Sequence, residues 1–152
     1  MDGFPVVHVP FELTEYRNLT SAAKGEYWLE IILEAINYVG RLWNWDLKLF
    51  QEIGEQLREK NFRDIWRYKK LVKSPTGRRS AGILVEQDVE VAKIYLQVLK
   101  GREEEKRILL KETASSAWVY SQWLGKIAWV DDESLEVSCA ARKEKIISRI
   151  GK

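Results

Sequence analysis

One long stretch of regularly spaced apolar residues, from Thr20 to Trp43, limits the fold of this chain more than any other feature. Large apolar side chains recur there every three or four residues, which is the period of an α-helix with one apolar face. Glu30, Glu34 and Arg41 fall on the opposite face. The apolar positions are Trp28, Ile31, Ile32, Ala35, Ile36, Val39, Leu42 and Trp43. The pattern predicts a long amphipathic helix.

Similar patterns continue along the chain and favour an all-α fold. A second helix is predicted to begin near Asn44 or Asp46, either of which can act as its N-cap, and to end near Lys60. Further helices are predicted over 61–73, about 86–100, about 102–130 and from Ser134 onward. A chain of 152 residues with 45% apolar content has room for one well-buried core. We therefore predict a compact bundle of five or six helices, forming a single domain over residues 20–152.

The first 19 residues are predicted to form an extended N-terminal arm. Pro5 and Pro10 remove backbone donors and favour extended backbone before them. An apolar arm needs a surface to lie on, which is either its own bundle, the slightly favoured alternative, or a neighbouring subunit. The apolar residues of the arm are Phe4, Val6, Val7, Val9 and Phe11.

Residues 74–82 are rich in proline, glycine and serine and are predicted to form a loop with Arg78 and Arg79 at its tip. The apolar run Ile83–Val85 then has two interpretations. It is either a short strand that pairs back onto residues 70–73 to make a hairpin around 74–85, or the lead into the helix at 86. We favour the helix lead.

Positive charge is concentrated in one part of the sequence. Nine basic residues lie within 22 residues that contain only two acids, Glu59 and Asp64, whereas the whole chain has a net charge of only +2. Such segregation indicates an anionic partner, because ordinary solvated surfaces intersperse their charges. The basic residues are Arg58, Lys60, Arg63, Arg67, Lys69, Lys70, Lys73, Arg78 and Arg79.

Aromatic residues Phe62, Trp66 and Tyr68 interleave with these cations, which favours nucleic acid over an acidic protein as the partner. On the predicted helix over 61–73, the spacing of Arg63, Arg67 and Lys70 gives a cationic stripe. Side chains of this kind suit contact with phosphates better than the reading of bases. The sequence predicts a non-catalytic nucleic-acid-binding subunit of a coat, nucleoprotein or ribonucleoprotein assembly.

Two other functions fit the same charges. A dimeric regulator could use residues 47–73 as a DNA-binding helix-turn-helix, although Arg58, Glu59 and Lys60 occupy the turn where such motifs carry small and apolar residues. A protein-interaction adaptor could use the basic face to bind an acidic partner. Strong preference for one short duplex would favour the regulator, and absence of any binding to nucleic acid would favour the adaptor.

The motifs of common enzymes and cofactor sites are not present in the sequence. His8 is the only histidine, and the chain has no zinc-like Cys/His spacing, no P-loop and no dinucleotide-binding glycine pattern. The acids Asp131, Asp132 and Glu133 suit Mg²⁺ in kind, but adjacent acids are explained more simply as the start of a helix. Cys139 has no cysteine to pair with. We expect no metal, no cofactor and no catalysis.

Seven tryptophans are more than one small core readily buries, so some are expected at an interface within a homo-oligomer or larger complex. Trp43, Trp45 and Trp123 are the candidates, together with the arm. No apolar run has the roughly 18 residues needed to cross a membrane, which predicts a cytoplasmic or virion protein. Abundant Lys, Arg and Glu with few Met and Cys is a bias typical of thermophilic proteins.

Overall fold

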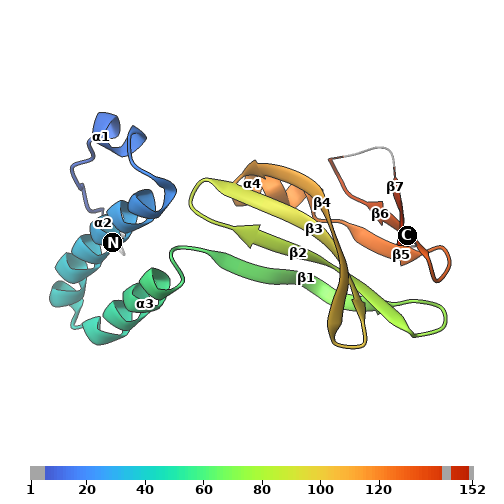
Figure 1. The fold of residues 1–152 in the computed structure, drawn as a ribbon. Helices are drawn as coiled ribbons and strands as arrows, with labels where there is room; N and C mark the ends of the chain where they lie inside the picture. Colours follow the sequence, from blue (N-terminus) through green and yellow to red (C-terminus); the bar gives the residue numbers. More distant parts are fainter. Residues whose placement is uncertain (1–5, 142–144, 151–152) are drawn as a thin grey trace, which may run out of the picture. The chain divides into compact units, whose positions relative to one another are not determined.

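The computed structural model describes residues 6–141 and 145–150, and the chain forms two compact units, residues 1–63 and 64–152. The first unit is helical and contains α1 (Leu13–Arg17), α2 (Ser21–Trp43) and α3 (Leu47–Glu59). The second consists mainly of antiparallel strands (Figure 1). The all-α bundle predicted as a single domain over 20–152 is therefore wrong.

The two helices with the clearest sequence signals are confirmed. Thr20 is the N-cap of α2, and its hydroxyl accepts a hydrogen bond from the Ala23 amide; Asp46 is the N-cap of α3 and accepts from Lys48. Asn44 ends α2 in the left-handed conformation that asparagine tolerates better than most residues. The arm is not wholly extended, because α1 lies within it.

Helices α2 and α3 form an antiparallel hairpin that packs through glycines. Gly54 of α3 faces Leu29 and Leu33 of α2, while Leu47 at the start of α3 lies against Gly40. At the other end, Phe62 packs so closely on Gly25 that a methyl group there would overlap its ring. Because glycine has no side chain, the backbones of α2 and α3 can approach each other closely at these positions.

The second unit is built from two antiparallel sheets. The larger sheet has the strand order β1-β2-β3-β4, and the smaller has the order β5-β6-β7. A short helix and one 3₁₀ turn connect the sheets. The elements are β1 (Asp64–Lys73), β2 (Arg79–Gln87), β3 (Val91–Lys100), β4 (Glu103–Ala114), α4 (Ala117–Tyr120), η1 (Ser121–Trp123), β5 (Lys126–Trp129), β6 (Ser134–Ser138) and β7 (Ile146–Arg149).

The core of this unit lies between the sheets. Leu96 and Val98 of β3 meet Leu135 and Val137 of β6, and all four are fully or almost fully buried. A second cluster packs Trp66 and other side chains of β1 on the centre of the larger sheet. The unbroken apolar run Ala81–Val85 of β2 is typical of a strand at the centre of such a core.

The predicted helices after residue 60 are absent because strand pairing determines the conformation there. Most of residues 61–73, predicted to be the basic helix, form β1, where Trp66 and Tyr68 face the core and alternate with Ile65 and Arg67, which are exposed. This alternation has the period of a strand. The range 86–100 holds the end of β2 and all of β3, and the range 102–130 holds β4, α4, η1 and β5. The range from Ser134 holds β6 and β7.

The segment 74–85 forms the hairpin that the sequence analysis placed second. Ile83 pairs with Tyr68, and Ala81 pairs with Val72 across the turn. The helix-turn-helix predicted over 47–73 is also excluded, since its second helix is strand β1. Within the described parts of the chain, no helix combines the length and apolar character that a membrane span requires.

Candidate nucleic-acid interface

Strand β1 contains an irregularity at its centre that changes where its lysines point. Pairing with β2 is regular up to Tyr68 and resumes at Val72, with a register shift between them. Lys69 lies in this interval with a φ of 62°, a conformation that few residues other than glycine adopt. Regular alternation would send Lys69 and Lys70 to opposite faces of the sheet. At this irregularity, Lys69 and Lys70 both belong to the lining of one pocket.

The pocket has a volume of about 220 Å³ and opens between β1, β2 and the start of β5. Lys126, at the start of β5, adds a third ammonium group to its wall. Among the described residues that line it, none is acidic. The lining consists of Tyr68, Lys69, Lys70, Val72, Gly82, Ile83, Gly125, Lys126 and Ile127. This pocket therefore combines three cations with an apolar floor.

One contact holds β5 beside β1, and another holds the start of β5 against β6. The indole Nε1 of Trp129 donates a hydrogen bond of 2.9 Å to the Val72 carbonyl oxygen. At the other end of β5, Gly125 lies so close to Ser138 of β6 that a β-carbon on it would overlap the Ser138 carbonyl group. The first contact joins the two sheets, so the position of Lys126 beside β1 depends on both sheets being folded.

Two more exposed cations continue from the pocket along the same hairpin. Lys73 ends β1, and Arg78 lies at the tip of the turn between β1 and β2. At roughly 3.3 Å per residue, the four residues from Lys69 to Lys73 span about 13 Å. We call Lys69, Lys70, Lys73, Arg78 and Lys126 the basic edge. It is a row of cations rather than a point, so it suits a chain of phosphates better than one small anion.

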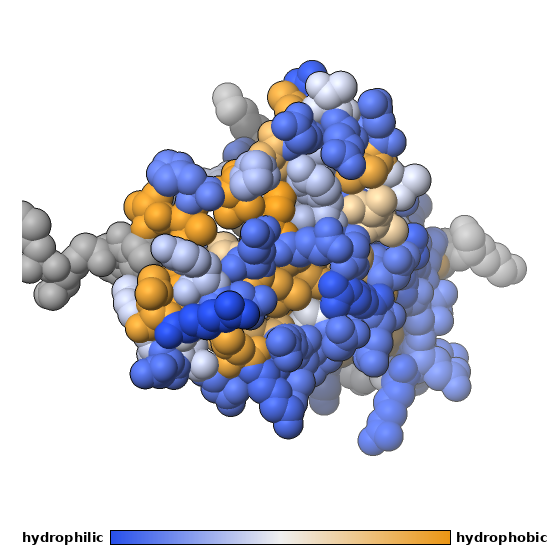
Figure 2. Space-filling view, turned by 90° about the vertical axis from the view of Figure 1, so that its left-hand side faces the viewer, coloured by the Kyte–Doolittle hydropathy of each residue, from blue (hydrophilic) through white to orange (hydrophobic). Residues whose placement is uncertain are grey.

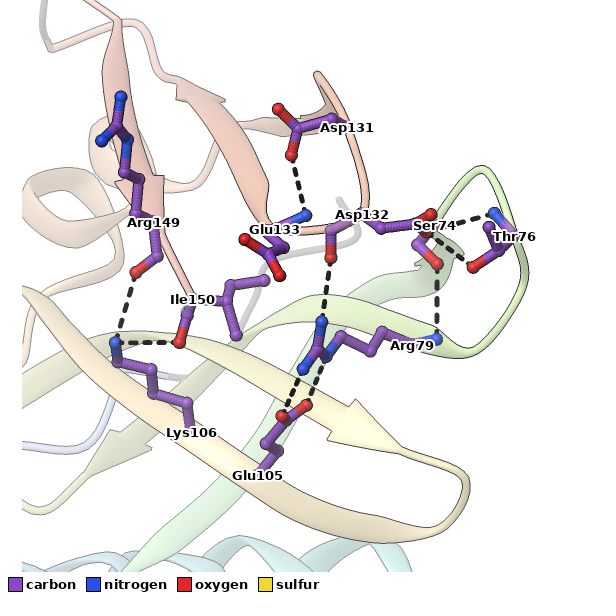
Figure 3. A network of polar contacts seen from close by, with 10 residues as sticks. All are labelled: Ser74, Thr76, Arg79, Glu105, Lys106, Asp131, Asp132, Glu133, Arg149 and Ile150. Atoms are coloured by element: carbon purple, nitrogen blue, oxygen red, sulfur yellow. Dashed lines mark hydrogen bonds and ion pairs between the residues drawn. The ribbon is translucent and has the colours of Figure 1, made fainter. Parts of the chain in front are cut away.

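The neighbouring acids are already engaged elsewhere in the unit. Arg79 donates two hydrogen bonds of 2.6 Å to the Glu105 carboxylate and one of 3.1 Å to the Asp132 carbonyl oxygen (Figure 3). Arg107 pairs with Glu86 and, at 2.8 Å, with Glu104. These arginines neutralise carboxylates of the larger sheet. No ion pair joins a carboxylate to Lys69, Lys70 or Lys126 within residues 6–141 and 145–150.

The turn of the hairpin holds a carboxylate of the same chain. The amide and the hydroxyl of Thr76 both donate to Asp132, at 3.2 and 2.7 Å, and the hydrogen bond from the hydroxyl lowers the pKa of Asp132 below its ordinary value. Figure 3 shows this contact between the turn and the segment joining β5 to β6. Thr76 is therefore committed to an internal contact. Asp131, Asp132 and Glu133 form a turn between strands, not the start of a helix.

Acid should weaken the contact between Arg79 of β2 and Glu105 of β4 within the larger sheet. The hydrogen bonds from Arg79 lower the pKa of Glu105, so its charged form is more stable in the folded unit than in the unfolded chain. This contribution is fully present above about pH 4.3, the ordinary value for glutamate, and is lost as the pH falls through the lowered folded pKa. We predict that Glu105→Gln lowers stability at pH 7 but scarcely changes it near pH 2.

Urea unfolding followed by circular dichroism between these pH values measures the effect. The matched control is Glu103→Gln, which removes an exposed carboxylate two residues away that makes no ion pair in the described residues. The prediction is contradicted if both variants lose the same stability at pH 7, or if the loss caused by Glu105→Gln persists in acid.

The structure separates the nine basic residues predicted to bind nucleic acid. Arg58 lies on α3 and pairs with Glu26 and Glu55, so it is a structural residue of the helical hairpin. Lys60 and Arg63 also belong to the helical unit. Arg67 donates to Gln97, and Arg79 binds Glu105. The predicted stripe of Arg63, Arg67 and Lys70 does not exist, because it requires a helix.

Four of the nine predicted residues lie together on the basic edge: Lys69, Lys70, Lys73 and Arg78. Lys126 was missed by the sequence analysis. It is 53 residues from Lys73 and has no basic neighbours in sequence, so only the pairing of sheets reveals its place. Near the C-terminus, the basic residue Lys145 pairs with Glu136 at 2.7 Å.

The residues predicted for an interface lie in both units. Phe4 lies outside the described residues. Val6, Val7 and Val9 line a hollow of about 310 Å³ with Ala35 and Tyr38 of α2, so this part of the arm lies along its own helix. Phe11 joins an aromatic cluster with Tyr16, Tyr27 and Trp28. Trp43 and Trp45 are about half exposed, and Trp123 packs in the strand-rich unit.

No group of histidine, cysteine and acidic side chains suited to a metal ion occurs in the described residues. Comparison with family models, with curated proteins and with solved structures found no match for this chain.

Proposed function

We propose that this chain is a non-catalytic nucleic-acid-binding protein that contacts the phosphate backbone through the basic edge. One observation carries the proposal. At the irregularity of β1, Lys69 and Lys70 line one pocket together with Lys126 of β5, and the described lining of this pocket contains no acid. Strained backbone in proteins clusters at functional sites, and strand irregularities often re-aim a side chain there. The unfavourable backbone conformation of Lys69 therefore occurs at the pocket that the three lysines line.

The arrangement of the basic edge favours a nucleic acid over other anions. Its cations extend for more than 10 Å along one hairpin, so they match a row of phosphates. Tyr68 lies in the pocket beside Lys69, whose Nζ is 4.7 Å from the centre of the tyrosine ring. An aromatic ring beside cations is the arrangement that proteins use to hold unpaired bases.

The pocket of the basic edge lacks the side chains that read base sequence. Specific base contacts rely mainly on arginine, asparagine and glutamine, and the pocket lining contains only lysine among polar side chains other than Tyr68. Lysine binds phosphate as a point charge. We therefore expect binding that is largely independent of sequence and that weakens steeply as salt rises.

Chemical footprinting of lysines in the wild-type protein tests the proposal. Amine modification is measured by mass spectrometry, with and without random-sequence DNA or RNA, in about 50 mM and about 200 mM salt. We expect Lys69, Lys70 and Lys126 to become protected at the lower salt and to regain their reactivity at the higher. Internal controls are Lys48, Lys93 and Lys100, which lie on α3 and β3 away from the pocket.

Four outcomes would contradict the proposal. If Lys69, Lys70 and Lys126 are modified equally with and without nucleic acid, then nucleic acid is not the partner of the basic edge. Protection of the control lysines to the same degree means nonspecific adhesion rather than a site. Protection by an acidic polypeptide but by neither DNA nor RNA would instead support the adaptor function. Protection by one duplex sequence alone would contradict the expected independence of sequence.

A further inference from the structure

Helix α2 has more apolar surface than a two-helix hairpin can cover. Its charged residues between Gly25 and Trp43 are Glu26, Glu30, Glu34 and Arg41. At roughly 100° per residue, these four fall within an arc of about 80°. The rest of the circumference is almost entirely apolar or small. A helix with so little polar surface normally lies inside a larger packed structure.

Two sides of this apolar circumference are covered by the chain itself. Leu29 and Leu33 pack on Gly54 of α3. On the side away from α3, residues 6–10 of the arm lie along Ala35 and Tyr38. Phe11 stacks on Trp28 at the start of the helix, with ring centres 5.2 Å apart. The third side, between the arm and α3, is left without a covering element in the helical unit.

The uncovered side, together with the exposed part of Trp28 and with Leu42 one turn beyond Tyr38, carries large apolar side chains that are 40–65% exposed. Helix α3 adds a matching stripe at every fourth position, and the turn between the helices adds one tryptophan. The set, which we call the apolar face, is Trp28, Ile32, Leu42, Trp43, Trp45, Leu49, Ile53 and Leu57. In Figure 2, which looks at the side of the helical unit drawn on the left of Figure 1, orange patches lie exposed between hydrophilic side chains.

The helical geometry places the two stripes on one side of the hairpin. On α2, Ile32 lies roughly 80° from the direction that contacts α3; on α3, Ile53 lies roughly 100° from the contact at Gly54, in the same rotational sense. Because the helices are antiparallel, rotations of equal sense turn both side chains to the same side. Glu52, Glu55 and Glu59 lie on the opposite flank of α3. The apolar face is therefore continuous and carries no acidic residue.

The size of the apolar face fits a protein partner. An aromatic side chain has roughly 150–250 Å² of surface, so the exposed parts of its three tryptophans amount to roughly 200–330 Å². The five aliphatic side chains contribute at least as much again. The total reaches the upper end of the roughly 300–600 Å² that a monomer exposes as its largest patch. It approaches the roughly 800 Å² per partner of a stable interface.

We propose that the apolar face binds the same face of a second copy of this chain, giving a two-fold symmetric dimer with a four-helix interface. A symmetric contact brings each patch onto itself, so any charge in it would meet a like charge. The apolar face avoids this conflict because the acids of both helices lie elsewhere. Two antiparallel hairpins packed in this way form a common helical bundle. The inference rests on the helical unit alone and does not depend on nucleic-acid binding.

Sedimentation velocity of the full chain over about 1–100 µM, in about 0.5 M salt, tests the proposal. We expect a dimer. The variant Ile32→Glu/Ile53→Glu introduces two charges into the apolar face and should raise the dissociation constant at least 100-fold. The control is Leu109→Glu/Val130→Glu, which changes two similarly exposed apolar residues of the strand-rich unit and should remain dimeric. Both substituted positions on the apolar face are 44–49% exposed, so the hairpin tolerates them.

Helix content measured by circular dichroism shows whether the variants fold. If the double variant loses helix content, the single variant Leu57→Glu, at the end of the stripe, replaces it with the same expectation. The proposal is overturned if the wild-type chain is monomeric at about 100 µM. Protection of residues 49–57 from hydrogen exchange in that monomer would mean that the chain's own second unit covers the apolar face. Equal dissociation by the control variant overturns it as well.

Discussion

Gly125→Ala is expected to unfold the strand-rich unit at temperatures where the wild-type unit remains folded. A β-carbon added at Gly125 would overlap the carbonyl oxygen of Ser138 and lie 2.7 Å from its carbonyl carbon. These are backbone atoms of β6, which is paired with β5 from Lys126 onward. A flexible side chain could move aside, but a paired strand cannot move without losing its hydrogen bonds and the buried contacts of Leu135 and Val137.

The expected loss is about 3 kcal/mol or more, at the upper end of what overpacking costs. In a unit of roughly 60–100 residues, each kcal/mol corresponds to about 4–8 °C in the unfolding midpoint. Thermal unfolding followed by strand circular dichroism should therefore show a midpoint at least about 12 °C lower. Because Gly125 lines the pocket, the same variant should also lose nucleic-acid binding.

Gly77→Ala is the matched control for this prediction. Gly77 lies in the turn between β1 and β2 with a φ of 70°, and a β-carbon there meets nothing within 4 Å. Its replacement costs only the strain of a left-handed alanine, which is about 1 kcal/mol. If the two variants lose similar stability, then the close approach of Gly125 to Ser138 is not a constraint on the fold.

The helical unit could be predicted from the sequence because its signals are local. The caps Thr20 and Asp46 and the apolar period of α2 lie within the helices that they specify. The strands could not be identified in this way. In β2, the run from Ala81 to Val85 has no polar side chain on either face, so neither a helical nor a strand period is visible. Its conformation is set by pairing with β1 and β3, which lie before and after it in the sequence.

The same limit applies to the candidate site. The stretch of nine basic residues identified the hairpin that carries Lys69, Lys70, Lys73 and Arg78. Segregation of charge along the sequence can be seen whether the segment is a helix or a strand. It did not show which cations are engaged: Arg58 and Arg79 have partners 32 and 26 residues away. The irregular pairing at Lys69 likewise depends on β2. Ion pairs between residues far apart in the sequence therefore decide which basic residues remain available to bind an anion.

The second large effect concerns binding. Replacing Lys69, Lys70 and Lys126 by glutamine should weaken affinity for random-sequence nucleic acid by roughly 100-fold near 0.1 M salt. Each phosphate contact contributes about 0.7–0.9 to the slope of log affinity against log salt, so the slope should fall by about 2 to 3. Glutamine keeps much of the length of lysine and removes its charge. All three side chains are exposed, so the fold should persist.

Lysines on an edge strand also prevent unwanted pairing between sheets, and this second role needs no ligand. The two roles differ in what the variant does. Loss of a protective role would cause aggregation without changing the affinity of the soluble fraction. Loss of a binding role changes the affinity and its salt dependence while the protein stays dispersed.

The most direct test of the account is therefore the salt dependence of binding by three proteins. These are the wild type, the variant Lys69→Gln/Lys70→Gln/Lys126→Gln and the control Lys48→Gln/Lys93→Gln/Lys100→Gln, which loses the same charge outside the basic edge. The account predicts a slope lower by about 2 to 3 for the first variant alone, with the control within about threefold of wild-type affinity. Equal slopes for all three proteins, or an equal loss of affinity in both variants, would contradict it.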